Sequence, residues 1–277
     1  MIMYRLNETR HFLSVAVLLM ALLFNPLCAY ATELTVVGTG DSQLLLQALA
    51  DAFESHHPKV KVTIPPSIGS SGGVRAVASG ADVIGRIARP LTKNEQQFNL
   101  SYHLFAYSPV VFIVNQSVAG IEGLTAQQAL DIFSGKITNW SEVGGPEHKI
   151  YLVNREEGDS SRLVLDRQIE GFATIEKSPG PIFYSTPEAM NALADNPFTI
   201  GYGPISMVKG PSMRALRFNG YSADTTLTSD GTYPLQSPFA LIWKGPLSAP
   251  GQRFVEFLSS QESADIMRTF GVQPAGN

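Results

Sequence analysis

The hydrophobic positions of this chain follow two spacings that alternate along most of its length. Short apolar runs rich in β-branched residues, at 34–37, 60–64 and 107–115, are typical of buried strands. Residues 43–53 instead place leucine and alanine along one face of a helix. Strands that alternate with helices predict an α/β fold with mainly parallel sheets. Further strands are expected at 82–85, 150–153, 199–203, 233–235 and 239–243, and further helices at 74–79, 125–135, 163–169, 187–193, 251–258 and 261–270.

Three of the predicted strand-to-helix connections are short and rich in glycine and hydroxyl residues. They lie at 38–42, 67–73 and 154–162. The first turn of a helix has amide hydrogens without partners inside the helix and carries partial positive charge, so it can hold an anion. In a parallel sheet such connections lie beyond the carboxyl ends of the strands and would converge on one cleft. The alternative interpretation is that all three are simply tight turns.

The third connection contains the strongest candidate chemistry. Arg155 would add a planar, permanently charged group beside the free amides. Asp159 and Ser160 stand where the cap of the following helix is expected, and Thr125 with Gln128 has the spacing of a capping box further upstream. The candidate ligand-binding residues of the three connections are Thr39, Gly40, Asp41, Ser70, Ser71, Gly72, Arg155, Asp159, Ser160 and Ser161.

Two of these candidates carry the wrong charge for an anion site. Asp41 and Asp159 accept hydrogen bonds but do not donate them unless protonated, and two carboxylates would repel one dianion. Either both aspartates turn away and cap helices, which is the preferred interpretation, or the ligand is not an ordinary dianion. Arg86 follows a buried strand and either offsets one of the aspartates or lies at the surface.

Composition and charge narrow the possible function classes. The chain has 277 residues, enough for two modest domains or one large one, and 16% charged residues, which is typical of a globular protein. Its net charge of −4 argues against a nucleic-acid-binding face. His56 and His57 are adjacent and lack the spacing of a metal site, so neither a metal nor a cofactor is expected.

The N-terminus has the features of a cleavable signal peptide. Arg5 and Arg10 precede an apolar run at 12–24, which is shorter than the ~20 residues that a membrane-spanning helix needs. Ala29 and Ala31 fit the small-residue rule for cleavage, so the signal peptide is expected at 1–31. An uncleaved anchor is the alternative.

The only cysteine of the chain, Cys28, falls inside the expected signal peptide. A lipoprotein signal prefers a small residue before the cysteine, and Leu27 is not small, so cleavage without lipidation is expected. The mature chain would then contain neither a thiol nor a disulfide. An exported protein of this size without cysteine fits a bacterial periplasm, where its stability must come from its core.

Several motifs resemble the phosphate-binding protein family of bacterial ABC importers. They are IFSGKITNW at 132–140, REEG at 155–158, IGY at 200–202, ASGAD at 78–82 and RPL at 89–91. The resemblance covers most of the mature chain. It implies a two-lobed clamshell of the type II periplasmic binding protein kind, in which each lobe is a mainly parallel sheet flanked by helices and the chain crosses twice. Lobe I would comprise 32–112 with 221–277, and lobe II would comprise 113–220.

The same resemblance implies a function. A monomeric periplasmic receptor would close on phosphate or a related oxyanion, hold it with amides, hydroxyls and Arg155, and deliver it to a membrane ABC permease. Asp41, Ala88 and Asp159 depart from the hydroxyl residues that the family usually has. These departures leave open a binding module of the same fold with altered or lost phosphate affinity, used for sensing or adhesion.

An enzyme is the least supported of the three function classes. Catalysis would need a nucleophile with a base, or a metal cluster. Ser160 does not lie in a Gly-x-Ser-x-Gly motif, and His103 and His148 have no readable triad context. The sequence therefore predicts a binding protein without catalytic residues.

Overall fold

The computed structural model describes residues 32–276, except 82 and 224–232. The expected signal peptide at 1–31, with Cys28, lies outside the described residues. Within the described part of the chain, no helix combines the length and the hydropathy that a membrane span requires.

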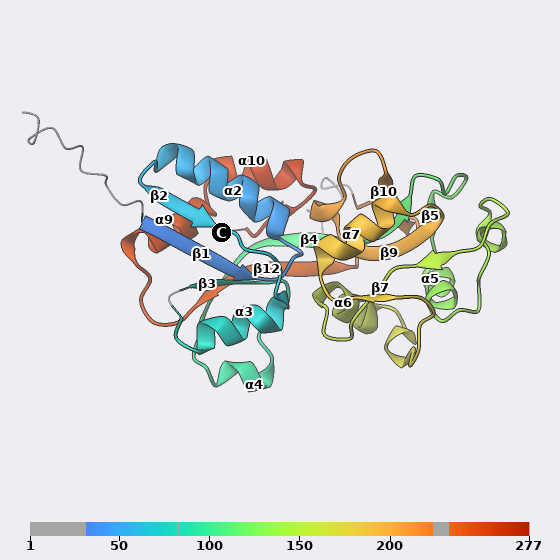
Figure 1. The fold of residues 1–277 in the computed structure, drawn as a ribbon, viewed down its shortest axis with the longest axis horizontal. Coiled ribbons are helices and arrows are strands. Elements are labelled where there is room, and N and C mark those ends of the chain that lie inside the picture. Colours follow the sequence, from blue (N-terminus) through green and yellow to red (C-terminus); the bar gives the residue numbers. More distant parts are fainter. Residues whose placement is uncertain (1–31, 82, 224–232, 277) are drawn as a thin grey trace, which may run out of the picture. The chain divides into compact units, whose positions relative to one another are not determined.

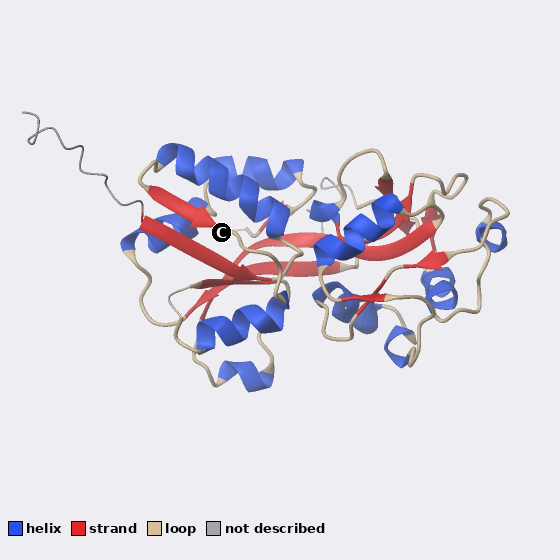
Figure 2. Ribbon diagram, in the orientation of Figure 1, coloured by secondary structure: helices blue, strands red, loops and turns tan. Residues whose placement is uncertain are grey.

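A mixed sheet of nine strands forms the centre of the described structure (Figures 1 and 2). Its central path runs in the order β2-β1-β3-β12-β4-β9-β6, and β10 and β13 pair with β4. The strands are β1 (Thr32–Gly38), β2 (Val60–Thr63), β3 (Ile84–Ile87), β4 (Ser101–Asn115), β6 (Tyr151–Leu152), β9 (Thr199–Pro204), β10 (Met213–Ala215), β12 (Gln236–Trp243) and β13 (Gln273–Pro274). Two small parallel pairs are separate from it: β5 (Gly123–Leu124) with β11 (Arg217–Phe218), and β7 (Asn154–Arg155) with β8 (Ile182–Phe183).

The prediction of mainly parallel sheets is wrong for the middle of this sheet. β1 pairs in parallel with β2 and β3, and β6 with β9, but every pair that β4 or β12 makes is antiparallel. A strand buried on both faces reads as a continuous apolar run whichever way its neighbours run. The hydrophobic pattern therefore located these strands without revealing their direction.

The helices lie on both faces of the sheet. α2, α9 and α10 cover one face of the β1-β2-β3 end, and α3 and α4 lie on the other (Figure 1). The helices are α2 (Gln43–His56), α3 (Gly69–Ala78), α4 (Lys93–Gln96), α5 (Ala126–Phe133), α6 (Ser160–Gln168), α7 (Thr186–Asp195), α9 (Ala249–Phe257) and α10 (Gln261–Thr269). Short 3-10 helices occur at Trp140–Val143, Phe172–Thr174 and Ile205–Met207.

The hydrophobic core divides into two large clusters that share β4. Phe105 and Ala106 of this strand pack with β1, α2, α9 and α10. Residues 110–114 of the same strand pack with β9, α5, α6 and α7. Leu235, directly before β12, belongs to the second cluster, and Phe239 within β12 belongs to the first, so the chain also passes from one cluster to the other at the start of β12.

Local signals placed most helix ends correctly. The Thr125 capping box forms as predicted, because Thr125 Oγ1 accepts from the Gln128 amide at 3.1 Å and Gln128 Oε1 accepts from the Thr125 amide at 2.9 Å. The predicted strand at 233–235 is not a strand.

The start of α3 differs from its prediction by five residues. Residues 69–73 were expected in a loop, but α3 begins at Gly69 and places Ser70, Ser71 and Gly72 in its first turns. Glycine usually indicates a loop, yet here it permits close packing of the helix on the sheet. A Cβ atom at Gly73 would lie 3.0 Å from the Gly38 Cα of β1.

Candidate anion-binding site

The three connections singled out in the sequence meet around one cavity of about 200 Å³. They come from the end of β1, the start of α3 and the β7–α6 turn. The structure brings seven of the ten candidate residues to this cavity: Thr39, Ser70, Ser71, Gly72, Arg155, Asp159 and Ser160. Gly40, Asp41 and Ser161 are not among the lining residues, but Asp41 and Ser161 are buried directly beside it.

The first turns of α3 and α6 touch each other at the cavity wall. Ser70 Oγ and Ser160 Oγ lie 2.9 Å apart, although the residues are ninety positions apart in the chain. Ser70 Oγ also accepts a hydrogen bond from the Ala88 amide at 3.1 Å. Two helix N-termini, each with its partial positive charge, therefore face the same small space.

Arg155 lies at the end of β7 with its guanidinium buried at this site. Its Nε donates to the Phe183 carbonyl at 3.1 Å, and its Nη1 donates to Thr186 Oγ1 at 2.9 Å. Its Nη2 forms an ion pair with Asp159 Oδ2 at 2.8 Å. A guanidinium has five N–H groups, so these contacts leave two for another partner.

Asp159 both caps a helix and neutralises Arg155. Its Oδ1 accepts from the Arg162 amide at 3.0 Å, which confirms the predicted cap of α6. Its other oxygen makes the ion pair with Arg155, a contact that capping alone did not predict. Burial raises the pKa of the Asp159 carboxyl to about 7, with the Arg155 charge acting against that rise and Asp41 adding to it.

The capping prediction for Asp41 is wrong. Ser42 is the N-cap residue of α2, and the helix has no side-chain cap. The fully buried Asp41 carboxyl instead accepts from Thr186 Oγ1 at 2.5 Å and from Ser161 Oγ at 3.3 Å. Burial raises its pKa, while the charge of Arg155 and these hydrogen bonds lower it. Hydroxyls from two distant helix starts attract this side chain away from its own helix.

Both sequence interpretations of Arg86 are also wrong. The side chain is fully buried, so it is not a surface residue. Its guanidinium donates to the main-chain carbonyls of Thr39 and Pro65, each at 2.7 Å, and to that of Val36. A longer bond of 3.5 Å goes to Gln43 Oε1, and none goes to either aspartate. Burial lowers the pKa of Arg86 to about 10. It therefore holds the β1 connection in place instead of compensating the site.

Several cavity residues were not predicted from the sequence. Thr186 starts α7 and links Arg155 to Asp41, because it accepts from the first and donates to the second. No signal in the sequence indicated Thr186, because no glycine-rich loop precedes it and Ser185 indicates only an ordinary helix cap. The other lining residues are Ser67, Ile68, Gly69, Arg75, Glu156, Gly158 and Tyr184. Those at 67–69 and 156–158 lie within the predicted connections, whereas Arg75 and Tyr184 lie outside them.

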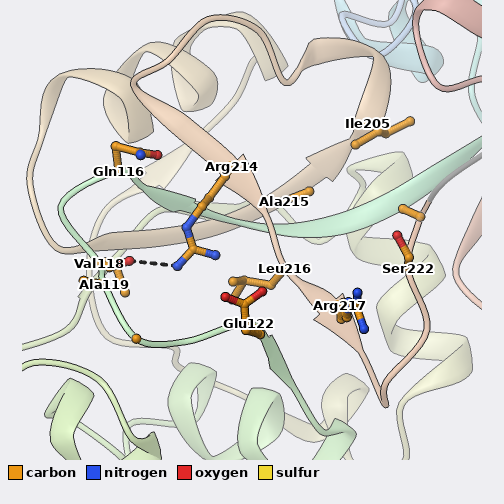
Figure 3. A pocket seen from close by; sticks show the side chains of 12 residues that line it. Gln116, Val118, Ala119, Glu122, Ile205, Arg214, Ala215, Leu216, Arg217 and Ser222 are labelled. Atoms are coloured by element: carbon orange, nitrogen blue, oxygen red, sulfur yellow. Dashed lines mark hydrogen bonds between the residues drawn. The ribbon is translucent and has the colours of Figure 1, made fainter.

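A larger cavity of about 610 Å³ lies elsewhere and contains none of the candidate residues (Figure 3). Arg214 projects into it and donates to the Val118 carbonyl at 2.8 Å. Its other charged residues, Glu122 and Arg217, are exposed. The smaller cavity instead has a buried arginine together with buried hydroxyls, which is the arrangement that can replace the hydration shell of an oxyanion.

The described residues offer no alternative metal chemistry. Among them, no group of three or more histidine, cysteine, aspartate or glutamate side chains is placed to hold a metal ion. His56 contacts Glu262 at 3.0 Å on the surface. The groups that face the 200 Å³ cavity are amides, hydroxyls and a guanidinium, which can bind an anion, together with the carboxyl of Asp159.

The chain resembles known proteins in both sequence and structure. The PBP superfamily domain matches residues 29–262. The "Phosphate-binding protein PstS" of Bacillus subtilis is 27% identical over 233 residues, which are 83% of this chain and 76% of that protein. The protein of the same name from Borreliella burgdorferi is 24% identical over 265 residues, covering 91% and 93%. A solved structure from Clostridium perfringens is described as a phosphate ABC transporter substrate-binding protein with bound phosphate. It is 28% identical to this chain, with a TM-score of 0.80, and the alignment covers 88% of this chain and 100% of the other.

Proposed function

This chain belongs to the PBP superfamily, and we propose that it binds phosphate or a related oxyanion in the cavity beside Arg155 and delivers it to an ABC permease. Its relatives are phosphate-binding components of transporters, a non-enzymatic family, in agreement with the absence of a catalytic motif expected from the sequence. The proposed ligand contacts are the hydroxyls of Thr39, Ser70 and Ser160, the amides of the α3 and α6 first turns, and the two remaining N–H groups of Arg155.

One observation carries this proposal: a buried arginine and two helix N-termini share one small cavity. Arg155 is 5% exposed, and the hydroxyl oxygens of Ser70 and Ser160, in the first turns of the two helices, lie 2.9 Å apart. Donors held in a site without water bind an anion more strongly than the same donors in solvent. Arg75 of α3 lines the same cavity and adds a second positive charge.

We further propose that the two core clusters correspond to two lobes that close on the ligand. β4 and β12 pass from one cluster to the other, which suits a clamshell with two crossings. On this proposal the crossings lie at 106–110 and 235–239, some residues away from the limits at 112/113 and 220/221 expected from the resemblance. Cleavage after residue 31 and a periplasmic location stay part of the proposal.

A thermal-shift screen tests the proposed ligand class. A ligand that binds only the folded protein raises its stability by about 2.7 kcal/mol at a concentration one hundred times Kd, which corresponds to about 5–10 °C in a domain of this size. We expect phosphate or arsenate to raise the Tm, in a screen that also contains sulfate, molybdate and small organophosphates. No shift with any of these anions would contradict the proposal.

The buried aspartates favour a second candidate function. Asp41 takes the hydroxyl of Thr186 and Asp159 takes the charge of Arg155, a donor and a charge that a phosphate would otherwise use. A protein of this fold with weakened phosphate affinity would act in sensing or adhesion. Binding of phosphate at micromolar concentration by the unaltered protein would exclude this candidate.

A further inference from the structure

The guanidinium of Arg155 already has a carboxylate as its partner. Asp159 Oδ2 lies 2.8 Å from Arg155 Nη2, and only 4% of each side chain is exposed. A carboxylate presents its oxygens to a guanidinium in the same way as two oxygens of an oxyanion do. An oxyanion that enters the cavity therefore meets an arginine whose charge is neutralised by the protein itself.

Resting on the proposed function, we propose that Asp159 is a specificity-determining residue that competes with the oxyanion for Arg155, so that the protein captures its anion together with one proton. The proton comes from solvent and binds to the Asp159 carboxyl. The proton removes the negative charge of Asp159, so the oxyanion replaces it as the negatively charged partner of Arg155 and uses the two N–H groups that remain free.

The hydrogen bonds of Asp159 allow this exchange without loss of the helix cap. Its two oxygens have separate roles, because Oδ1 accepts from the Arg162 amide and Oδ2 pairs with Arg155. A proton on Oδ2 removes the charge that holds Arg155 and leaves Oδ1 as the acceptor of the cap. The same carboxyl also lines the cavity, so an ionised Asp159 would repel an anion bound there.

The surroundings of Asp159 set the pH range of the exchange. Burial raises its pKa to about 7, and the negative charges of Asp41 and Glu156 act in the same direction, whereas the charge of Arg155 opposes the rise. Proton uptake by this group is therefore accessible near neutral pH. The titratable and charged groups around it are Arg155, Asp41, Glu156, Arg162, Tyr202 and Arg75.

Calorimetry with inorganic phosphate tests the competition directly. We would titrate the protein and an Asp159→Asn variant at about pH 6 and pH 8, in two buffers that differ in ionisation enthalpy, to obtain both affinity and protons exchanged. Asparagine keeps an oxygen that can cap α6, and Asp159→Ser provides a second variant with a good capping residue. Phosphate itself titrates in this range, but its contribution is common to all variants.

We expect Asp159→Asn to bind phosphate about tenfold more tightly than the unaltered protein at pH 8 and nearly equally at pH 6. We also expect the unaltered protein to take up close to one proton more per phosphate at pH 8. The matched control is Asp166→Asn. It removes the ion pair between Arg162 and Asp166, which has the same i,i+4 spacing and a length of 2.7 Å but does not line the cavity. This control should keep the pH dependence of the unaltered protein.

Three other results would overturn the inference. Identical pH profiles for the unaltered protein and Asp159→Asn would show that Asp159 does not compete. Weaker binding by both Asp159→Asn and Asp159→Ser would make the carboxyl a ligand contact instead. Phosphate binding by none of the variants at either pH would contradict the proposed function itself, and the inference would be lost with it.

Discussion

At the scale of single residues, Arg155 connects the charges of the site. It contacts Asp159 directly and Asp41 through Thr186. Arg155→Ala should weaken anion affinity by about 2–5 kcal/mol, because the anion loses its buried charged donor. Calorimetry with phosphate would measure this loss. Arg214→Ala, which alters one of the two arginines of the 610 Å³ cavity, should leave the affinity unchanged, and equal losses in the two variants would remove Arg155 from the site.

The buried carboxyls also predict how stability depends on pH. The folded pKa of Asp159 is raised to about 7, so between pH 5 and 7 the unfolded chain has released this proton while the folded chain retains it. The free energy of unfolding should therefore fall as pH rises, by up to about 3 kcal/mol from this group. The raised pKa of Asp41 acts in the same sense.

Urea denaturation at pH 5, 6 and 7 in phosphate-free buffer would measure this trend. The Asp159→Asn variant should show a flatter dependence, because it lacks the titrating group. The range avoids the Glu95 carboxyl, whose pKa is lowered to about 2, chiefly by its hydrogen bond with Arg89. An equally steep or steeper fall with pH in the Asp159→Asn variant would contradict the raised pKa, because the comparison cancels the other titrating groups.

At the residue scale, the sequence identified the functional side chains better than it identified their hydrogen-bond partners. The cap formed by Asp159 was predicted because capping depends on the next three residues only. The partners of Asp41 were not predicted, since Thr186 and Ser161 are 145 and 120 positions away along the chain. The same holds for Arg86, whose main-chain acceptors belong to two separate connections.

At the scale of elements, the end of β1 is tightly enclosed by its neighbours. Gly38 has a φ of +141°, and a Cβ atom there would lie 2.0 Å from the Arg86 carbonyl oxygen. Gly38→Ala should therefore destabilise the protein by about 3 kcal/mol or more, through strain and displacement of the β1 connection. Thermal and urea denaturation would measure the change.

Gly158→Ala is the matched control for this substitution. A Cβ atom at Gly158 meets no other atom within 4 Å, and its φ does not require glycine. We expect its stability to stay within about 0.5 kcal/mol of the unaltered protein. A loss in Gly38→Ala no larger than that of the control would show that β1 and β3 can separate at this point.

The strand and helix positions were largely predictable, but their pairing was not. The apolar runs located β1, β2, β9 and the second half of β4, because burial alone produces that pattern. Strand direction depends on connections that the pattern does not encode, and the antiparallel pairs of β4 were therefore missed. The α3 start was missed because five small residues resemble a loop until the sheet is packed against them.

At the scale of the whole molecule, the chain belongs to the PBP superfamily and its hydrophobic core is organised around β4 and β12. The PBP superfamily match extends over residues 29–262, and the Clostridium perfringens structure superimposes with a TM-score of 0.80. The two core clusters meet along these strands. The walls of the cavity come from helices at different parts of the sheet, because α3 packs with β1, β3 and β12 and α6 packs with β9 and β12.

The sequence by itself determined the α/β class, the helix caps at Thr125 and Asp159 and the three connections that carry the candidate chemistry, because each depends on residues close together in the chain. Only the tertiary structure decided the direction of the central strands, the position of Thr186 and the pairing of Arg155 with Asp159 inside the cavity. Burial is the physical reason, since a charged group without water must pair with a neighbouring polar or charged group, and the tertiary structure decides which groups are neighbours.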